Sequence, residues 1–507
     1  MRRSGLMEAR YGLTGALLVA GLLGPGLPAS ATALAAAATA GPDPTTGGVP
    51  IHHVVEIMLE NHTFDNLFGY LGGANGIPEA TTFPSPFVAG QVVSPLLAPP
   101  DQGSVGPNLD NSRQIELQAM DHKPGGFFAM DHYTVTPYEG LASITVFPPS
   151  VDPNLQFLAT HYALAESNFQ PEIAPTLPNV LAALSGTSDG WYSNSDPPAA
   201  DKFYTVFDQL QRAGHSWQVF NGGDGPVAGP IWGHLVPAGQ TDNVVGTDRF
   251  ITEATDGTLP NFSFVRPGAG YSEESPEDTS LGDAWLGQLV LAVMKGPDWP
   301  STVIFFTYDE GGGYWDHVPP PQVDVAGDGT RTPMVVISAY TTPQFITQTT
   351  TNLSVLSFMQ ELWHLPALDI TNLQAPDLFQ YFDFHEIPRP PALPPAAPPA
   401  TLLLQETGPG AYYYTAPLGR PVTITVAAQT PGLTPDIGLN GLVTLSVTGP
   451  KGAPAASVPH LVLLKHGYGF FTARFPAYGY WRIKAVGPER SPGWITVGAG
   501  GVNANTP

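Results

Sequence analysis

The sequence predicts an α/β fold in which helices flank a mostly parallel sheet, followed by a smaller antiparallel β-sandwich-like domain. Three near-continuous apolar runs, at residues 53–59, 302–308 and 333–338, are typical of parallel strands that are covered on both faces. Helical patterns lie between these runs, and alternation of strand and helix favours a parallel sheet. After a proline-rich stretch, the pattern changes to short runs with a period of two, which indicates antiparallel strands.

The N-terminus has the three parts of an export signal. Arg2, Arg3 and Arg10 supply positive charge, residues 13–23 form an apolar run, and small residues suited to cleavage follow it. The apolar run is too short to span a bilayer comfortably. We therefore expect residues 1–40 to be a removed signal peptide and the mature protein to be secreted or extracytoplasmic. An uncleaved anchor is the alternative.

The rest of the chain divides into three parts. We expect a large domain over residues 41–387, a stiff proline-rich linker over 388–400 and a β-rich domain over 401–507. In the large domain, the predicted helices are at 203–213, after a cap at Asp283 and after a cap at Ser354, and a strand is predicted at 216–220. The Gly- and Pro-rich residues of about 75–115 and 221–260 are expected to be loops or excursions from the core. In the last domain, the predicted strands are 422–426, 442–447, 481–486 and 494–497.

The composition excludes several classes of protein. The formal net charge is −24 and no cluster of Lys and Arg is present, so nucleic-acid binding is not expected. The absence of cysteine excludes disulfides, thiolate catalysis and cysteine-based zinc sites. The acidity either reflects solubility outside the cell or includes carboxylates that hold a cation, and only specific motifs can separate these explanations.

Two of the predicted strands end in acidic side chains. The first run is followed by Glu60 and Asn61, and the second by Asp309 and Glu310. Because ligands of open α/β sheets lie beyond the carboxyl ends of the strands, we expect these four side chains to converge at one edge. Hard oxygen donors of this kind suit a divalent metal ion, and at least one ion is expected. Alternatively, each pair begins an exposed turn or a loop.

Thr176 is the candidate nucleophile. It lies in Pro-Thr-Leu-Pro-Asn at 175–179, before an apolar helical segment, where the positive end of a helix dipole favours phosphate. A metal ion beside the hydroxyl would lower its pKa and make it nucleophilic. A helix-capping threonine is the alternative.

Two histidines are candidates for protonating a leaving oxygen or for binding phosphoryl oxygens. His122 lies in Met-Asp-His-Lys-Pro-Gly-Gly, and His317 lies in Trp-Asp-His-Val-Pro-Pro, just beyond the second acidic pair. The alternative for each is a structural or surface role, because the chain contains 13 histidines.

Several motifs, in the same order, resemble those of the phosphoesterase family that contains bacterial phospholipases C and AcpA-type acid phosphatases. Residues 53–69 resemble its opening motif "vvlmlENrsFDnyfG", and 175–187 resemble "PTxPNR…sGt". Residues 307–320 resemble "tyDEhgGffDHVxPP", 331–338 resemble the strand "RvPxlviSP", and 377–384 resemble the closing segment. The matches cover about residues 50 to 385.

The resemblance implies an alkaline-phosphatase-like core and a set of roles. It implies that Thr176 is the nucleophile and that His122 and His317 bind phosphate or act as acids, although the motif around His122 matches loosely. It implies metal ligation by four residues: Glu60, Asn61, Asp309 and Glu310.

This chain departs from the family in two places. The family often has Glu-His-Pro before the helix near Asp283, whereas residues 272–276 read Ser-Glu-Glu-Ser-Pro and contain no histidine. Val180 stands where the family has an arginine after Pro-Asn. Both departures bear on activity and substrate preference, and Glu273 or Glu274 are candidates to replace the histidine.

These observations predict an exported, metal-dependent hydrolase of phosphate esters, of the phospholipase C or acid phosphatase type. The expected substrate is a phospholipid or a small phosphomonoester, with peripheral membrane contact in the first case, and the oligomeric state is left open. The alternative is a secreted binding protein on a degenerate phosphoesterase scaffold, which recognises lipid or glycan without catalysis. The two departures favour the binding protein, whereas the retained acidic residues and Thr176 favour the enzyme.

Overall fold

The computed structural model describes residues 48–99, 103, 109–123, 126–136, 140–195, 202–223, 227, 229, 231–275, 277–321, 327–395, 402–407, 415–428, 438–487 and 493–499. The signal peptide predicted at 1–40 lies outside these residues. Within the predicted linker, residues 388–395 form neither helix nor strand. Among the helices in these ranges, none combines the length and the hydropathy needed to cross a membrane.

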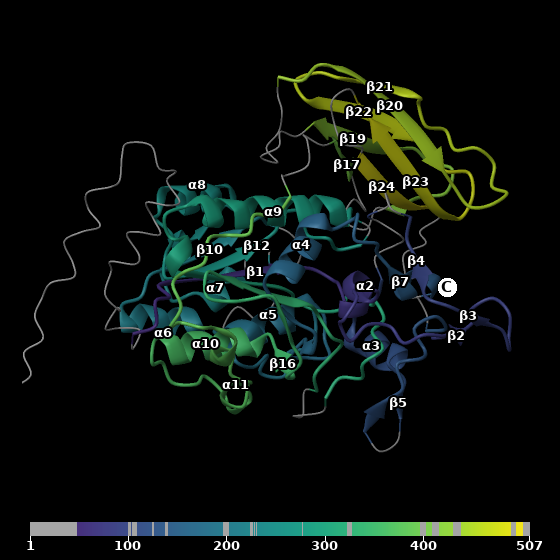
Figure 1. The fold of residues 1–507 in the computed structure, drawn as a ribbon. Helices are drawn as coiled ribbons and strands as arrows, with labels where there is room; N and C mark the ends of the chain where they lie inside the picture. Colours follow the sequence, from purple (N-terminus) through teal and green to yellow (C-terminus); the bar gives the residue numbers. More distant parts are fainter. Residues whose placement is uncertain are drawn as a thin grey trace, which may run out of the picture.

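A mixed eight-stranded sheet forms the centre of the large domain (Figure 1), and the predicted α/β architecture is confirmed. In spatial order, its strands are β11 (Val244–Val245), β10 (Trp217–Asn221), β12 (Phe262–Arg266), β1 (His53–Leu59), β13 (Thr302–Tyr308), β14 (Met334–Ser338), β8 (Ala163–Ala165) and β15 (Gln344–Ile346). β1 lies between β12 and β13 and runs parallel to both. Nearly every side chain of β1 and β13 is buried, which explains their continuous apolar runs.

The expectation that residues 333–338 form a parallel strand is wrong, because β14 runs antiparallel to β13. A parallel neighbour needs a long crossover, usually a helix. The described residues of this connection, 309–321 and 327–333, contain no helix. The chain therefore turns back at the edge where β13 ends, and the connection carrying Asp309 and Glu310 stays at that edge.

Helices cover both faces of the sheet (Figure 1). One face carries α4 (Pro153–His161), α8 (Asp248–Asp256) and α9 (Thr279–Lys295), and the other carries α5 (Thr176–Ser185), α6 (Val206–Ala213), α10 (Leu353–Leu362) and α11 (Ile370–Leu373). Three short helices lie in connections: α2 (Phe64–Phe68), α3 (Arg113–Ala119) and α7 (Trp232–Leu235). α7 and α8 lie within 221–260, so the prediction of loop there is wrong for these two segments.

The helix predicted to begin at Asp283 begins one turn earlier. Asp278 caps α9 by accepting a hydrogen bond from the backbone of its first turn. Asp283 lies inside α9, and its carboxylate accepts hydrogen bonds from the backbone N–H groups of Asn154 (3.1 Å) and Leu155 (2.8 Å) at the start of α4. Asp283 therefore satisfies the end of a neighbouring helix, a contact that only the tertiary structure creates.

The other two predicted helices are present with small shifts. α6 begins at Val206, because Thr205 and Asp208 form a capping box there. α10 begins one residue before Ser354, whose hydroxyl accepts a hydrogen bond from the backbone of Thr351 (3.3 Å).

Short strands fill the connections around the sheet. They are β2 (Phe83–Pro84), β3 (Val92–Val93), β4 (Leu96–Leu97), β5 (His122–Lys123), β6 (Phe127–Phe128), β7 (Thr145–Val146), β9 (Asn168–Phe169) and β16 (Thr350–Thr351). A small hydrophobic cluster that includes Phe83, Met120, Phe128 and Trp315 packs the segments before β8 against the connection that follows β13.

The C-terminal residues form two sheets around their own core, in which Ile424, Leu445, Phe471 and Trp481 are buried. One sheet has the order β17 (Leu402–Thr407), β19 (Val422–Ala428), β22 (Tyr468–Ala473). The other has the order β18 (Thr415–Ala416), β24 (Gly493–Ala499), β23 (Gly479–Val486), β20 (Gly441–Thr448), β21 (Leu461–Leu464). The four predicted strands correspond to β19, β20, β23 and β24. We call this unit the C-terminal sandwich, and it contacts the large domain where Ala427 packs with Leu281 and Tyr271.

Candidate functional site

The residue pairs Glu60–Asn61 and Asp309–Glu310, which we call the acidic pairs because each contains a carboxylate, directly follow two neighbouring strands. β1 and β13 are parallel neighbours in which Leu59 pairs with Tyr308, so Glu60 and Asp309 follow at the same level. The backbone N–H of Asn61 donates to Oδ1 of Asp309 (3.3 Å). All four predicted ligands are almost fully buried. They therefore lie buried at the carboxyl edge of the sheet rather than in an exposed turn.

The glycine run after Glu310 allows the two loops to pack together. Asn61 has a φ of 70° and Gly312 a φ of 64°, both in the left-handed region. A Cβ atom on Gly312 would lie 2.4 Å from the Cβ of Asn61, closer than any real contact. A Cβ atom on Gly311 would lie 2.0 Å from Oγ1 of Thr330. The glycines are thus required by the close approach of the loops.

Thr176 is the first residue of α5, and its hydroxyl donates to Oε2 of Glu60 (3.0 Å). Asn179, in the first turn of the helix, holds the preceding turn: its Nδ2 donates to the carbonyl of Ala174 (2.6 Å) and its Oδ1 accepts from the N–H of Glu172 (3.0 Å). The Pro-Thr-Leu-Pro-Asn motif therefore fixes a buried hydroxyl at a helix N-terminus beside the acidic pairs.

Arg266 is a site residue that the sequence analysis did not identify. It ends β12, the other neighbour of β1, and its side chain is 1% exposed. Its guanidinium forms an ion pair with Glu60 and lies 3.6 Å from Oδ2 of Asp309. The rule that located the acidic pairs applies here too, because Arg266 also ends a parallel strand of the same sheet. It was missed because residues 262–266 were not recognised as a strand.

Glu310 has its own set of donors. Nδ2 of Asn111 donates to Oε1 of Glu310, and the N–H of Gly312 donates to Oε2 (2.7 Å). Nδ2 of Asn111 also lies 3.5 Å from Oδ1 of Asn61. Asn111 therefore links both acidic pairs to the segment that leads into α3, and it is a second residue missed by the sequence analysis.

Burial raises the pKa values of three carboxyl groups in this region, those of Asp309, Glu310 and Glu116. Loss of contact with water raises the pKa of Asp309, and Arg266 partly opposes the rise. The pKa of Glu310 lies well above its usual range because of burial and of the nearby charges of Asp309 and Glu116. Burial also raises the pKa of Glu116 to about 8. A bound divalent cation would reverse this trend by favouring the ionised forms.

The donor chemistry of this edge fits a divalent cation. The carboxylates of Glu60, Asp309 and Glu310, set against the single guanidinium of Arg266, leave a formal charge of −2 when all are ionised. Oδ2 of Asp309 is buried and accepts no hydrogen bond from the described residues. With the amide oxygen of Asn61 and the hydroxyl of Thr176, the available ligands are hard oxygen atoms, as Mg²⁺ and Ca²⁺ prefer.

Among the described residues, two other groups each bring three possible ligand atoms within 4.8 Å of one another. One group is Asp65, Asp316 and His317, and the other is Asp121, Asp131 and His132. In the first group, Arg331 already pairs with both carboxylates, at 3.0 Å and 2.9 Å. The second group is partly exposed and includes an ion pair with Lys123. Of these three groups, the one that holds Glu60, Asp309 and Glu310 has the largest excess of buried carboxylates over paired cations.

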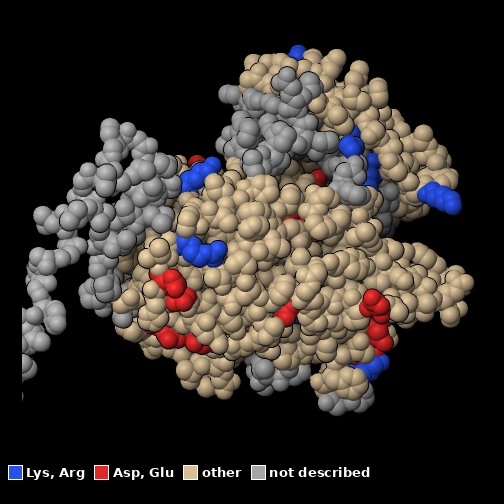
Figure 2. Space-filling view, viewed as in Figure 1, with Lys and Arg blue, Asp and Glu red and all other residues tan. Residues whose placement is uncertain are grey.

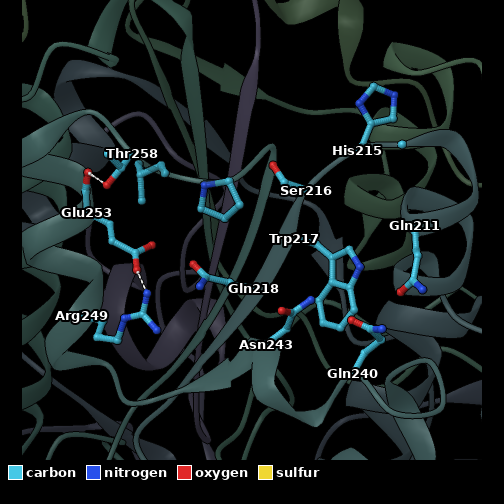
Figure 3. A pocket seen from close by; sticks show the side chains of 13 residues that line it. Gln211, His215, Ser216, Trp217, Gln218, Gln240, Asn243, Arg249, Glu253 and Thr258 are labelled. Atoms are coloured by element: carbon cyan, nitrogen blue, oxygen red, sulfur yellow. Dashed lines mark hydrogen bonds and ion pairs between the residues drawn. The ribbon is translucent and has the colours of Figure 1, made fainter.

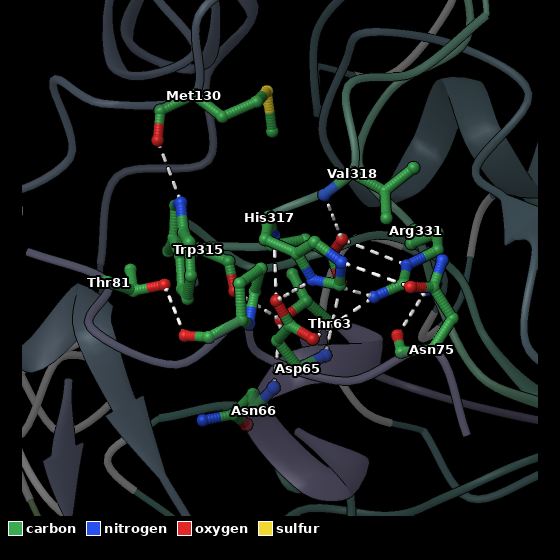
Figure 4. Close-up of polar contacts among 12 residues, drawn as sticks. Thr63, Asp65, Asn66, Asn75, Thr81, Met130, Trp315, His317, Val318 and Arg331 are labelled. Atoms are coloured by element: carbon green, nitrogen blue, oxygen red, sulfur yellow. Dashed lines mark hydrogen bonds and ion pairs between the residues drawn. The ribbon is translucent and has the colours of Figure 1, made fainter. Parts of the chain in front are cut away.

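His317 belongs to the first of these groups (Figure 4). Its backbone N–H and its Nδ1 each lie 2.7 Å from Oδ2 of Asp65, and Nε2 lies 3.3 Å from Oδ1 of Asn75. Arg331 fixes Asp65 through its other carboxylate oxygen (3.0 Å). Thr63 ties this network to the loop after β1 by donating to the carbonyl of Trp315 (2.8 Å). Asp65 thus orients the imidazole and leaves Nε2 as its partly exposed atom.

Among the described contacts, none joins His122 to another candidate site residue. His122 is exposed on the hairpin of β5 and β6, where its ring centroid lies 5.0 Å from that of Phe128. Its catalytic role stays a prediction that rests on the loosely matching motif.

The segment at residues 272–276, where the family's histidine is absent, contacts the loop after β1, because the backbone N–H of Glu60 donates to the carbonyl of Ser272 (3.0 Å). Glu273 has a φ of 70°, and its Oε2 accepts a hydrogen bond from the hydroxyl of Tyr308 (2.7 Å) and lies 3.6 Å from Nε2 of His62. Burial raises the pKa of Glu273 well above its usual range and lowers that of His62 to about 4, so burial favours the uncharged form of each side chain. Glu273 therefore supports the loop after β1. Val180, at the second departure, is fully buried in the core.

The pocket in Figure 3 lies at the amino ends of the strands, opposite the end that holds Glu60 and Asp309. It has a volume of about 650 Å³ and is lined by residues of α6, α8 and the amino end of β10, including Trp217, Gln218 and Arg249. Since β10 runs parallel to its neighbour β12, and β12 to β1, this pocket lies at the end of the strands remote from Glu60.

The chain belongs to the phosphoesterase family, whose model matches residues 51–366. It is 26% identical over 306 residues to non-specific phospholipase C6 of Arabidopsis thaliana, covering 56% of this chain and 58% of that protein. It is 24% identical over 404 residues to the non-hemolytic phospholipase C of Burkholderia pseudomallei, covering 61% and 55%. The chain thus spans less than two thirds of the length of these relatives. A similar solved structure is a protein of the alkaline phosphatase superfamily from Vibrio parahaemolyticus, with a TM-score of 0.34, 12% identity and coverage of 80% and 86%.

Proposed function

We propose that this protein is an exported, metal-dependent hydrolase of phosphate esters that uses Thr176 as its nucleophile. We call the carboxyl edge of the sheet that holds Glu60, Asn61, Asp309 and Glu310 the acidic edge. The observation that carries the proposal is the hydrogen bond from Thr176 to Glu60, because it links a buried hydroxyl at a helix N-terminus to this edge. Membership of the phosphoesterase family supports the reaction class. The proposed cation ligands are Glu60, Asn61, Asp309 and Glu310, together with the hydroxyl of Thr176.

The residues of the edge would divide the reaction into two displacements. Oγ1 of Thr176 attacks phosphorus, the bond from phosphorus to the leaving oxygen breaks, and Glu60 is placed to accept the hydroxyl proton. Water then attacks the phosphothreonine, releases phosphate and restores the hydroxyl. A bound divalent cation would supply positive charge to the phosphoryl oxygens and to the hydroxyl of Thr176.

His317 is the proposed acid that protonates the leaving oxygen. Its Nδ1 is held by Asp65 at 2.7 Å, which fixes the ring and leaves Nε2 to donate. The side chain is 14% exposed, and the hydrogen bond from Thr63 to the carbonyl of Trp315 links its segment to the loop that follows Glu60. His122 is kept as a second candidate for contacting phosphoryl oxygens.

The proposed substrate is a phospholipid, with a small phosphomonoester as the alternative within the same reaction class. The two relatives described above, from Arabidopsis thaliana and Burkholderia pseudomallei, are named phospholipases C, and this favours the lipid. The second candidate function is a secreted protein that binds lipid or glycan without catalysis. The burial of Glu60, Asp309 and Thr176 disfavours it, since a binding protein has no need for unbalanced charge in its interior.

The proposed activity is tested by hydrolysis of a chromogenic phosphate ester and of phosphatidylcholine, with and without divalent cations. Removal of metal by a chelator should abolish product release, because no cation then supplies positive charge to the phosphoryl oxygens and to the hydroxyl of Thr176. Re-addition of Mg²⁺, Ca²⁺, Mn²⁺ or Zn²⁺, one at a time, should restore release with at least one of them. Undiminished hydrolysis after the metal content has been measured as zero would exclude metal dependence. No hydrolysis of either substrate with any of these ions would favour the binding protein.

Export is proposed from the N-terminal pattern of residues 1–40. The protein recovered outside the cytoplasm should begin between Thr32 and Gly41, after one of the two small-residue cleavage sites. N-terminal sequencing of the recovered protein checks this expectation. An intact Met1 on the exported form would show that the segment is not cleaved.

A further inference from the structure

Strands β20, β21 and β22 carry large apolar side chains on positions that face outwards. Burial alternates along β21 and β22, and the inward side chains, such as Val462 and Phe471, belong to the core of the C-terminal sandwich. Outward positions of such strands are usually polar. Here five of them are apolar, with these exposed fractions: Leu442 54%, Leu461 49%, Leu463 52%, Tyr468 37% and Phe470 66%. We call these five residues the apolar face.

The strand register places members of the apolar face side by side. Leu442 pairs with Leu463 across β20 and β21. A tight turn joins β21 to β22, in which Lys465 and Tyr468 exchange backbone hydrogen bonds of 2.8 Å and 3.1 Å. Leu463 and Phe470 each lie two residues outside this pair, at equivalent positions on the two arms. Leu442 and Leu463 are thus neighbours in one sheet, and the turn brings Phe470, on a strand of the other sheet, to the same end of the sandwich. Contiguous exposed apolar side chains mark an interaction surface.

The charge of the C-terminal sandwich differs in sign from that of the rest of the chain. Residues 401–507 contain seven Lys and Arg and three Asp and Glu, a formal charge of +4. The remaining residues contain 12 Lys and Arg and 40 Asp and Glu, a formal charge of −28. In the view of Figure 2, Lys and Arg are seen both on the upper part that the sandwich forms and on the large domain below it, whereas Asp and Glu are seen mainly on the large domain. Lys465 is exposed at the turn between Leu463 and Phe470.

We propose that the apolar face docks on a lipid bilayer that contains anionic phospholipid. Apolar side chains beside cations suit such a surface, because the side chains enter the acyl boundary while the cations meet the lipid phosphates. A second copy of the chain would bring one cationic sandwich against another, which disfavours a symmetric dimer through this face. β20, β21 and β22 also lie on the side of the sandwich away from the eight-stranded sheet in Figure 1, and the five side chains of the apolar face are exposed. The choice of phospholipid rests on the proposed function.

The test is co-sedimentation of the full chain with vesicles of phosphatidylcholine alone and of phosphatidylcholine with phosphatidylglycerol. The wild-type protein should bind the anionic vesicles more tightly, and added salt should weaken that difference. The double variant Leu463→Ser, Phe470→Ser should bind the vesicles with an affinity at least about tenfold lower, because two inserted apolar side chains are lost. Lys465→Glu should reduce binding to anionic vesicles only. The matched control is Leu373→Ser, which alters a side chain of similar exposure (66%) on α11 and should bind as the wild type does.

Hydrolysis of a soluble chromogenic phosphate ester separates this proposal from the proposed function. All of these variants should hydrolyse it at the wild-type rate, since none alters the acidic edge. Vesicle binding that is absent in the wild type, or unchanged in the double variant, would overturn the docking surface and leave the activity standing. Vesicle binding without hydrolysis would overturn the proposed function and leave the surface standing. Self-association that only the double variant lacks, without vesicle binding, would assign the face to a second copy.

Discussion

Replacement of Thr176 by valine is expected to lower phosphate-ester hydrolysis by about 10³-fold or more while the fold survives. Valine nearly keeps the shape of threonine and removes the oxygen that lies 3.0 Å from Glu60. Thr176→Ala should be equally inactive, whereas Thr176→Ser should keep part of the activity because it retains the hydroxyl. The stability cost of removing one buried hydrogen bond is only about 1 kcal/mol, which is too little to unfold the chain. Initial rates of product release at equal folded concentration give the comparison.

A matched control distinguishes a nucleophile from a residue that merely starts a helix. Thr205 is also buried at a helix start, where its side chain accepts from the N–H of Phe207 (3.3 Å) and donates to the carbonyl of Leu235 (2.8 Å). Thr205→Val should cost about 1 kcal/mol of stability and leave the rate unchanged. Full activity in Thr176→Val would return Thr176 to a structural role and leave the proposed reaction without a nucleophile.

The position of the acidic edge could be predicted because it depends on local patterns. Two apolar runs predict buried strands, and the rule that ligands meet at the carboxyl ends of parallel strands brings Glu60 and Asp309 together. The direction of β14 could not be predicted in the same way, because a short apolar run does not indicate whether the strand is parallel or antiparallel to its neighbour. Its direction follows from the connection after β13, which lacks a crossover helix in its described residues.

Residues that act across the fold were the ones missed or misplaced. Asp283 has the sequence signature of a cap for its own helix, yet it caps α4, because that helix end lies beside it in space. Arg266 is a lone charge after a short run of mixed residues, and only the sheet order shows that it ends next to Glu60. His317 could be located by its motif, whereas its partner Asp65 is identified by the tertiary contact alone.

Arg266→Met is expected to lower the free energy of unfolding of the metal-free protein by about 3–5 kcal/mol. Breaking a buried ion pair by removing one partner leaves the other charges uncompensated, and here these are the carboxylates of Glu60 and Asp309. If the acidic edge binds a divalent cation, the ion should restore part of this loss, because binding to the folded state alone stabilises it. The stabilisation by cation should therefore be larger in Arg266→Met than in the wild type. Chemical denaturation with and without chelator measures both quantities.

Arg331→Met is the matched control for that experiment, because Arg331 is equally buried and holds the carboxylates of Asp65 and Asp316. It should destabilise the metal-free protein by a similar amount of about 3–5 kcal/mol, since it also breaks buried ion pairs. Its stabilisation by cation should equal that of the wild type if the ion binds at Glu60 and Asp309. A larger stabilisation by cation in Arg331→Met than in Arg266→Met would move the metal site to the group of Asp65, Asp316 and His317. Because the readout is stability, this comparison holds even for variants that have lost all activity.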